Sequence, residues 1–403
     1  MAILWFMFFT TFCSLFLISN AERISSLPGQ PKKVTFKQYS GYIVTDEEHG
    51  RSLFYYFVEA QSKHALTRPL TVWFGGDHGC SSAGTSIFSG NGPFRTREEG
   101  KLSMNPSSWN LESNMLYIDS PIGTGFSYSN TSSDNTNWNY TMTVKENMKF
   151  LLKWFEKFPK YRNSDFYLAG DGGEGHLVPQ LAALVLEYNE NSDKPIKLKG
   201  LALGNLGIGT PGIDQGDYLW YHGVISPEAY TMAKNVCNVA EALYEEHHGK
   251  LSKNCEKTMK MLGKEMGPDF DMDSLLFTNC ESSDSRRQHV TSETKMGDPC
   301  LPDYTPVYLN KPEVQKAVHA NVTCLPYRWD SCDGPLNILP AYETKNFNTL
   351  TSLLKRRIQI LLYSGDQDVV NPVVETRKFA YTLAEDLKLI SLQKNRPWYN
   401  DNQ

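Results

Sequence analysis

Short apolar runs alternate with longer amphipathic stretches along most of this chain. The runs are rich in β-branched and aromatic residues, are bounded by turn residues, and cover 69–74, 114–118, 165–168, 198–203 and 358–363. Such runs predict strands buried on both faces, as in a parallel sheet. Between them, 143–158 places Val144, Met148, Leu151, Leu152 and Phe155 on one helical face, and 177–188 is apolar almost all round. The alternation predicts an α/β sheet with helices on both faces.

The alternation stops between about 212 and 303. Residues 227–246 and 256–264 have helical patterns, whereas 281–298 is polar and typical of a loop. This region also contains four cysteines. We therefore expect an inserted helical lid, held by local disulfides, after which the sheet pattern resumes beyond Val307.

The first 21 residues differ from the rest of the chain. Residues 3–18 are almost all apolar, and Ser19-Asn20-Ala21 offers a small-residue cleavage site before Glu22. An uncleaved membrane anchor is the alternative, but the run is shorter than the roughly 20 residues that span a bilayer. We expect 1–21 to be a cleaved secretory signal and 22–403 to form the mature domain.

Two further features agree with secretion, and the net charge bears on the kind of partner. Asn-x-Ser/Thr sequons occur at Asn130, Asn139 and Asn321. Of the eight cysteines only Cys13 lies in the signal, and the others should mostly pair in an oxidising compartment, in a connectivity that the sequence leaves open. The net charge of −5, without a basic stripe, argues against a nucleic-acid partner. We expect a protein outside the cell, with the vacuole as an alternative, and without membrane contact once the signal is removed.

The most informative motif is the run Gly170-Asp171-Gly172-Gly173-Glu174-Gly175. It lies between an apolar strand pattern and a helix pattern, where the Gly-x-Ser-x-Gly nucleophile elbow of α/β-hydrolases belongs. The central position is Gly172, and Glu174 replaces the second glycine. The local architecture predicts a serine hydrolase, yet its serine is absent.

Several phrases share the order and spacing of one family. They are Leu27-Pro28-Gly29, Tyr39-Ser40-Gly41-Tyr42, Gly79-Cys80-Ser81-Ser82 after Trp73, Asn91-Gly92-Pro93-Phe94, 119–128, 175–181 and 363–368. Together they resemble the plant serine carboxypeptidase-like family over nearly all of the mature chain. The resemblance implies an α/β-hydrolase with a lid insertion and no cofactor. Such proteins remove single residues from peptide C-termini, and some relatives instead transfer acyl groups from glucose esters.

The resemblance also assigns site residues. It implies Asp368 as the acid of the triad and Gly172 at the position of the nucleophile. The oxyanion-hole positions would be Asp77 and Gly173, and a carboxylate at 77 would oppose a developing oxyanion.

Three further positions would bind the substrate. Gly75 replaces an asparagine that helps to hold the substrate's terminal carboxylate, and Gly90 replaces an acidic residue. Asp171 replaces a glutamate, as it does in acyl-transferring relatives.

The triad base has no counterpart here. In this fold the histidine follows the aspartate, but none of the nine histidines follows Asp368. The chain also ends before the family's last strand and helix. We therefore expect a truncated member with an open sheet edge, of lower stability or dependent on a partner.

The family's disulfides would correspond to Cys80–Cys332, Cys237–Cys255 and Cys280–Cys300, with Cys324 left over. For His176 we expect a structural role, because the family has histidine there without using it in catalysis. The polar replacements Asp77, His78 and Glu174 match no common zinc spacing, so we expect no metal.

Three functions remain open. The first is a catalytically inactive serine carboxypeptidase-like protein, because the nucleophile and the base are missing. The second is a non-catalytic module that binds a peptide or an acyl glucoside. The third is an active carboxypeptidase or acyltransferase that uses recruited residues. The sequence leaves the oligomeric state undetermined.

Overall fold

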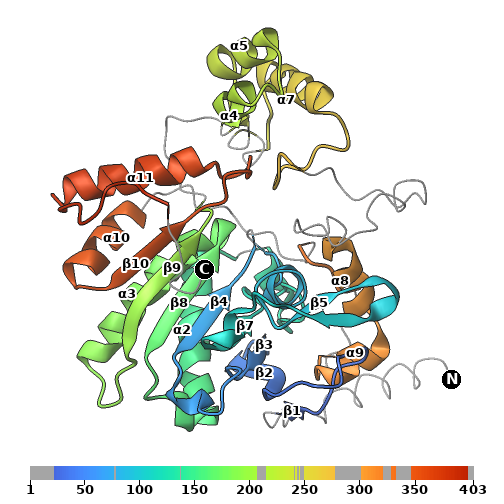
Figure 1. The fold of residues 1–403 in the computed structure, drawn as a ribbon, viewed down its shortest axis with the longest axis vertical. Coiled ribbons are helices and arrows are strands. Elements are labelled where there is room, and N and C mark those ends of the chain that lie inside the picture. Colours follow the sequence, from blue (N-terminus) through green and yellow to red (C-terminus); the bar gives the residue numbers. More distant parts are fainter. Residues whose placement is uncertain are drawn as a thin grey trace.

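The computed structural model describes residues 22–76, 79–136, 138–206, 215–239, 241–242, 245, 249–276, 301–320, 328–332 and 346–397. Within these residues the centre of the fold is an eight-stranded sheet in the order β1-β2-β3-β7-β4-β8-β9-β10 (Figure 1). Its strands are β1 (Glu22–Ile24), β2 (Gln38–Asp46), β3 (Arg51–Val58), β4 (Leu70–Phe74), β7 (Asn114–Ile118), β8 (Phe166–Asp171), β9 (Leu198–Gly204) and β10 (Gln359–Tyr363).

Five strands that are adjacent in the sheet, β7, β4, β8, β9 and β10, pair in parallel. They are the five strands that the apolar runs predicted. Every side chain of β4 and β7 is buried, which is why these strands lack an alternating pattern. Four of the seven strand pairings in the sheet are parallel, so the prediction of a mostly parallel sheet is confirmed.

The other half of the sheet is antiparallel, and the sequence patterns did not predict it. β1 pairs with β2, β2 with β3, and β3 with β7. Seven of the eight residues of β3 are buried, so this strand lacks the exposed polar face by which an antiparallel strand is usually recognised in a sequence. Its burial between two layers explains why an alternation of apolar and polar residues is missing.

Four helices cover one face of the sheet. They are α2 (Tyr140–Lys157), α3 (Leu177–Glu190), α10 (Asn346–Lys355) and α11 (Val373–Asp386) (Figure 1). α2 begins three residues earlier than predicted, because the Asn139 side chain accepts a hydrogen bond from Met142 N at 3.1 Å and caps the helix. Its buried stripe includes the predicted Leu151 and Phe155.

The second face of the sheet is covered by short elements rather than by long helices. They are η3 (Ala83–Ile87), the hairpin of β5 (Phe94–Thr96) and β6 (Leu102–Met104), and the helices α8 (Leu301–Leu309) and α9 (Pro312–Ala317). Trp73, Phe88 and Tyr308 are central to this second core. Both faces of the sheet are thus covered, as predicted.

A separate group of helices stands apart from the sheet in Figure 1. It comprises α4 (Gln215–Tyr221), α5 (Pro227–Asn235) and α7 (Lys253–Met266). The prediction of one helix over 227–246 is wrong, because α5 ends at Asn235 and the chain turns at Val236 before Cys237 enters a disulfide. That the whole of about 212–303 forms a lid stays a prediction, since 277–300 lies outside the described residues.

The remaining elements are short. They are η2 (Ala65–Thr67), η4 (Glu98–Gly100), η5 (Trp109–Leu111), η6 (Ser132–Asn135), η7 (Pro159–Tyr161) and η8 (Gly172–His176). In the described part of the chain, we find no helix with the length and apolar character needed to cross a membrane.

Candidate active site at the carboxyl end of the sheet

The predicted elbow has the backbone of a strand-to-helix turn. β8 ends at Asp171, Gly172 is buried with φ of 62°, and the chain continues through η8 into α3. A positive φ is the strained conformation that raises a nucleophile at this place. Glycine adopts it without steric cost, whereas another residue pays about 1–2 kcal/mol. The turn is present, but its central residue has no side chain.

Residues of neighbouring strands form a row beside the elbow. Phe74 of β4 pairs with Gly170 of β8, so Gly75 and Asp171 follow side by side. Asp171 pairs with Gly204 of β9, and Gly204 with Tyr363 of β10. Because side chains alternate along strands, this row points to the same face as Trp73. We call the surface formed by Gly75, Asp171, Gly204, Tyr363 and the adjacent Trp109 the elbow face.

Tyr363 lies across Gly204 toward Asp171. A Cβ atom on Gly204 would stand 2.5 Å from Cε2 and from the hydroxyl of Tyr363, so only glycine leaves room for the ring. Burial, and then the charge of Asp171, raise the pKa of the Tyr363 phenol well above its usual value. The half-buried Trp109 adds a second aromatic wall, with its ring centroid 6.4 Å from that of Tyr363 and 4.9 Å from that of Trp73.

The expected triad acid, Asp368, lies on the loop after β10 and is nearly buried. Its carboxylate accepts hydrogen bonds from the Asn205 side-chain amide and, at 2.9 Å, from Asn371 N. Asn205 follows β9 with a φ of 41°, a left-handed conformation that asparagine tolerates. Asn205 was not among the predicted site residues, although an asparagine directly after a strand is a turn signal.

The Asp368 loop is also attached to the separate group of helices. Tyr218 of α4 donates its hydroxyl hydrogen bond to Asp366 O, and Gln215 donates to Val370 O at 2.9 Å. Val369 packs in the core of this group. Burial, and then the charges of Asp366 and Asp368, raise the pKa of Tyr218.

The two glycines at expected substrate-binding positions pack against η3. The Ser86 hydroxyl accepts a hydrogen bond from Trp73 Nε1 at 2.7 Å, in the space that a side chain on Gly75 would need. A Cβ on Gly75 would overlap that hydroxyl and stand 2.5 Å from Trp73 Nε1. A Cβ on Gly90 would stand 2.9 Å from Thr85 O. No sequence pattern predicted that Ser86 fills this space.

A fully buried carboxylate supports the same loop. Asp119 accepts hydrogen bonds from Ser81 Oγ at 2.7 Å and from the backbone N–H groups of Ala83 and Phe126 at 3.0 Å. Burial raises the pKa of Asp119 to about 6, against the opposite effect of these hydrogen bonds. Asp119 therefore holds η3 in place below the elbow face.

The other expected residues are distributed as follows. Gly173 is buried in η8, while Asp77 and His78 lie outside the described residues. His176 Nδ1 accepts a hydrogen bond from the side-chain amide of Asn346, the first residue of α10, which agrees with a structural role. Glu174 lies in η8.

Two expected disulfides are present, Cys80–Cys332 and Cys237–Cys255. Cys280, Cys300 and Cys324 lie outside the described residues. Of the sequon asparagines, Asn130 and Asn139 are exposed, and Asn321 lies outside the described part.

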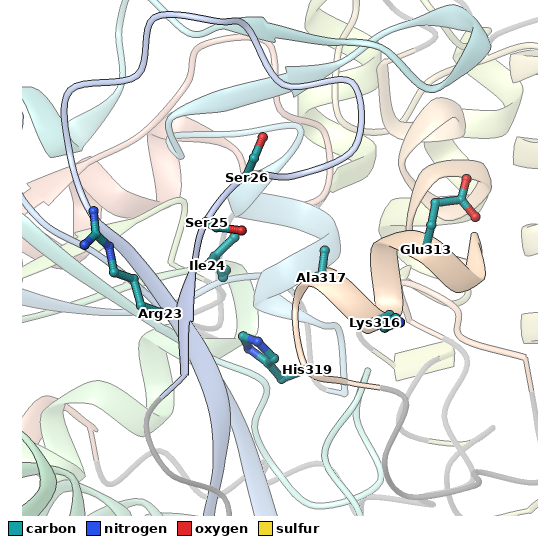
Figure 2. Close-up of a pocket in the computed structure, with 8 residues that line it drawn as sticks. All are labelled: Arg23, Ile24, Ser25, Ser26, Glu313, Lys316, Ala317 and His319. Carbon is teal, nitrogen blue, oxygen red and sulfur yellow. The ribbon is translucent and has the colours of Figure 1, made fainter.

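Two other features do not form a reactive centre. Glu241, Glu245 and Cys255 place potential ligand atoms within 4.8 Å of one another, but the Cys255 sulfur is in a disulfide and cannot act as a thiolate. A shallow cavity of about 330 Å³ lies between β1 and α9, remote from the elbow. Figure 2 shows that the side chains around it, such as Arg23, His319 and Glu313, do not converge on one point.

Comparison with solved structures defines the class of fold. The chain matches the crystal structure of a prohormone-processing carboxypeptidase from Saccharomyces cerevisiae with a TM-score of 0.62 at 21% identity. The match covers 87% of this chain and 77% of that one. The fold is that of an α/β-hydrolase.

Sequence comparison defines the family. A family model described as serine carboxypeptidase matches residues 28–403. The chain is 40% identical to Serine carboxypeptidase-like 46 of Arabidopsis thaliana, and the match covers 96% of this chain and 84% of that protein. It is 38% identical to Serine carboxypeptidase-like 45 of the same organism, with the same coverage. This chain belongs to the serine carboxypeptidase family.

Proposed function

We propose that this protein is a serine carboxypeptidase-like protein without the family's hydrolytic activity, which uses the elbow face to bind a peptide or an acyl ester. The observation that carries the proposal is Gly172, which stands at the centre of the elbow with a positive φ and offers no nucleophile. Asp368 keeps its hydrogen bonds from Asn205 and Asn371, but there is no serine hydroxyl for a base to activate.

The size of the expected loss follows from a related mechanism. In subtilisin, removal of the serine alone lowers turnover by about 10⁶-fold, nearly as much as removal of the whole triad. This corresponds to about 8 kcal/mol of transition-state stabilisation. The family resemblance assigns Asp77 to the oxyanion hole, and a carboxylate in that role would reduce the residual activity further.

Binding does not depend on the missing hydroxyl. Asp171, Tyr363 and Trp109 remain at the elbow face, and the surrounding loop is tied down by Asp119 and by the disulfide Cys80–Cys332. A module of this kind would hold its ligand and release it unchanged.

We further propose that the protein is secreted and glycosylated, and that it resides outside the cell or in the vacuole. The apolar segment 3–18, the two disulfides and the exposed sequons at Asn130 and Asn139 support this location. Expression with the leader should yield secreted protein whose mass falls on treatment with an N-glycosidase.

The decisive experiment tests turnover and nucleophile together. Purified protein is incubated with peptides that have free C-termini and, separately, with a fluorophosphonate that labels activated serines. We expect neither hydrolysis nor labelling of the wild type. Hydrolysis that the phosphonate blocks would overturn the proposal.

The matched variant is Gly172→Ser, with the same two readouts. Labelling of this variant but not of the wild type would mean that the serine alone had been lost. Absence of labelling in both would mean that the base is missing as well. Either result agrees with an inactive wild type, and the two results distinguish the loss of the serine alone from the loss of both serine and base.

A further inference from the structure

We infer that the elbow face selects an uncharged ligand end, an amide or an ester next to an aromatic group, and rejects a free carboxylate. This inference rests on the proposed binding function and names the class of ligand for the same site. It assigns Asp171 and Ser86 as the residues that determine specificity, and Trp109 and Tyr363 as the walls that contact the ligand.

The elbow face combines an acidic side chain with two aromatic ones. Asp171 and Tyr363 come from strands on either side of β9, and Gly204 between them carries no side chain. The rings of Tyr363 and Trp109 are both half-buried, which leaves apolar surface for a ligand. On the same side of β10, Leu361 is 57% exposed and extends this surface. Flat aromatic walls favour an aromatic or acyl group.

The donors around Gly75 that could hold a carboxylate already have hydrogen-bond partners. Beside Asp171, directly after β4, Gly75 donates its backbone N–H to Ser82 Oγ at 3.0 Å, so this donor is already used. The space next to it is filled by Ser86 and Trp73, whose indole N–H is directed to the Ser86 hydroxyl at 2.7 Å. An anion at this position would therefore have to displace existing hydrogen bonds.

Acidic side chains gather at this end of the sheet. Asp171 ends β8, and Asp366 and Asp368 follow β10, so three acidic side chains belong to the carboxyl end of two nearby strands. These charges act on two nearby phenols. After burial, Asp171 is the second cause of the raised pKa of Tyr363, and Asp366 and Asp368 contribute in the same way to the raised pKa of Tyr218. A negative potential of this kind opposes an approaching carboxylate and leaves an amide or ester unaffected.

The test compares two ligands that differ in one group. N-benzoyl-Phe-Phe-amide and the corresponding free acid are titrated by calorimetry into the glycosylated, full-length mature protein at neutral pH. We expect the amide to bind at least about tenfold more tightly than the acid, and the difference to shrink as salt is added.

Two variants locate the cause of the selectivity. Asp171→Asn should raise the affinity for the acid toward that for the amide, whereas Asp193→Asn, an exposed aspartate in the turn before β9, should change neither. Trp109→Leu should weaken both ligands to a similar extent, because it removes the aromatic wall and not the charge.

Each outcome decides between the two proposals. If the acid binds as tightly as the amide or more tightly, the inference is overturned and the binding function stands. The inference also fails if the amide is preferred but Asp171→Asn leaves the gap unchanged. If neither ligand binds up to its solubility limit, the proposed binding function fails, and the inference fails with it.

Discussion

Gly172 and Gly75 both stand where serine carboxypeptidase-like proteins are expected to carry a functional side chain, but their surroundings differ. At Gly172 the backbone keeps the strained conformation of the elbow, and the side chain alone is missing. At Gly75 the Ser86 hydroxyl and the Trp73 indole occupy the space that a side chain would need. The first site lacks a reactive group, whereas the second also lacks room for a side chain.

The largest effect is expected from Gly75→Asn. The new side chain must displace Ser86 and break the hydrogen bond from Trp73, so we expect a loss of about 3 kcal/mol or more in the free energy of unfolding. Chemical denaturation measures it. The control is Gly263→Asn in α7, where a Cβ meets nothing within 4 Å and the change should be small.

A second variant makes this prediction specific. Adding Ser86→Gly to Gly75→Asn should recover part of the stability, because it vacates the contested space. If Gly75→Asn alone were as stable as the wild type, Ser86 and Trp73 could not be blocking the space beside Gly75.

A slightly smaller effect concerns the carboxylate that supports η3. The pKa of Asp119 is raised from about 4 to about 6 in the folded protein, so folding favours the protonated form. Its stabilising contribution is fully present below pH 4 and is lost as the pH rises through 6, by about 3 kcal/mol in total. The free energy of unfolding, measured from pH 4 to 7, should fall in the wild type relative to Asp119→Asn.

The asparagine in that variant cannot accept every hydrogen bond that the carboxylate accepts, so a constant offset between the two proteins is expected as well. Only the dependence on pH reports the titration of Asp119. A difference that stays constant from pH 4 to 7 would refute it.

The smallest effect is expected from Gly172→Ser. If there is room for a side chain at the elbow, the serine should lower the free energy of unfolding by about 1–2 kcal/mol, because a non-glycine residue is strained at a positive φ. The matched control is Gly223→Ser, because Gly223 has a φ of 70° and open space around its Cβ position. Equal losses of unfolding free energy in the two variants would mean that Gly172, unlike Gly75, has room for a side chain. A much larger loss for Gly172→Ser would mean that neighbouring atoms occupy that space at the elbow as well.

The local elements could be predicted from the sequence, and the contacts between distant elements could not. The parallel strands follow from apolar runs, and the elbow follows from Gly172 between a strand and a helix. β3 was missed because burial on both faces removes its alternation. The helix predicted over 227–246 was too long because its pattern contains no sign of the turn at Val236.

The same division applies to the candidate site. Gly75, Gly172 and Asp368 were found through the resemblance to one family, which fixes positions along the chain. The role of Ser86 was not found, because it depends on how η3 packs against the end of β4. Tyr363 lying across Gly204 is a contact between residues 159 positions apart, and no local pattern encodes it.

The loop that carries Asp368 has two sets of attachments, one to Asn205 at the sheet and one to α4 through Tyr218 and Gln215. A displacement of α4 therefore acts directly on the loop, and a shift of the loop acts back on α4. Ligand contacts at the carboxyl end of the sheet would in this way reach the group of α4, α5 and α7 without touching it. We therefore expect hydrogen exchange of these helices to change when the site is occupied.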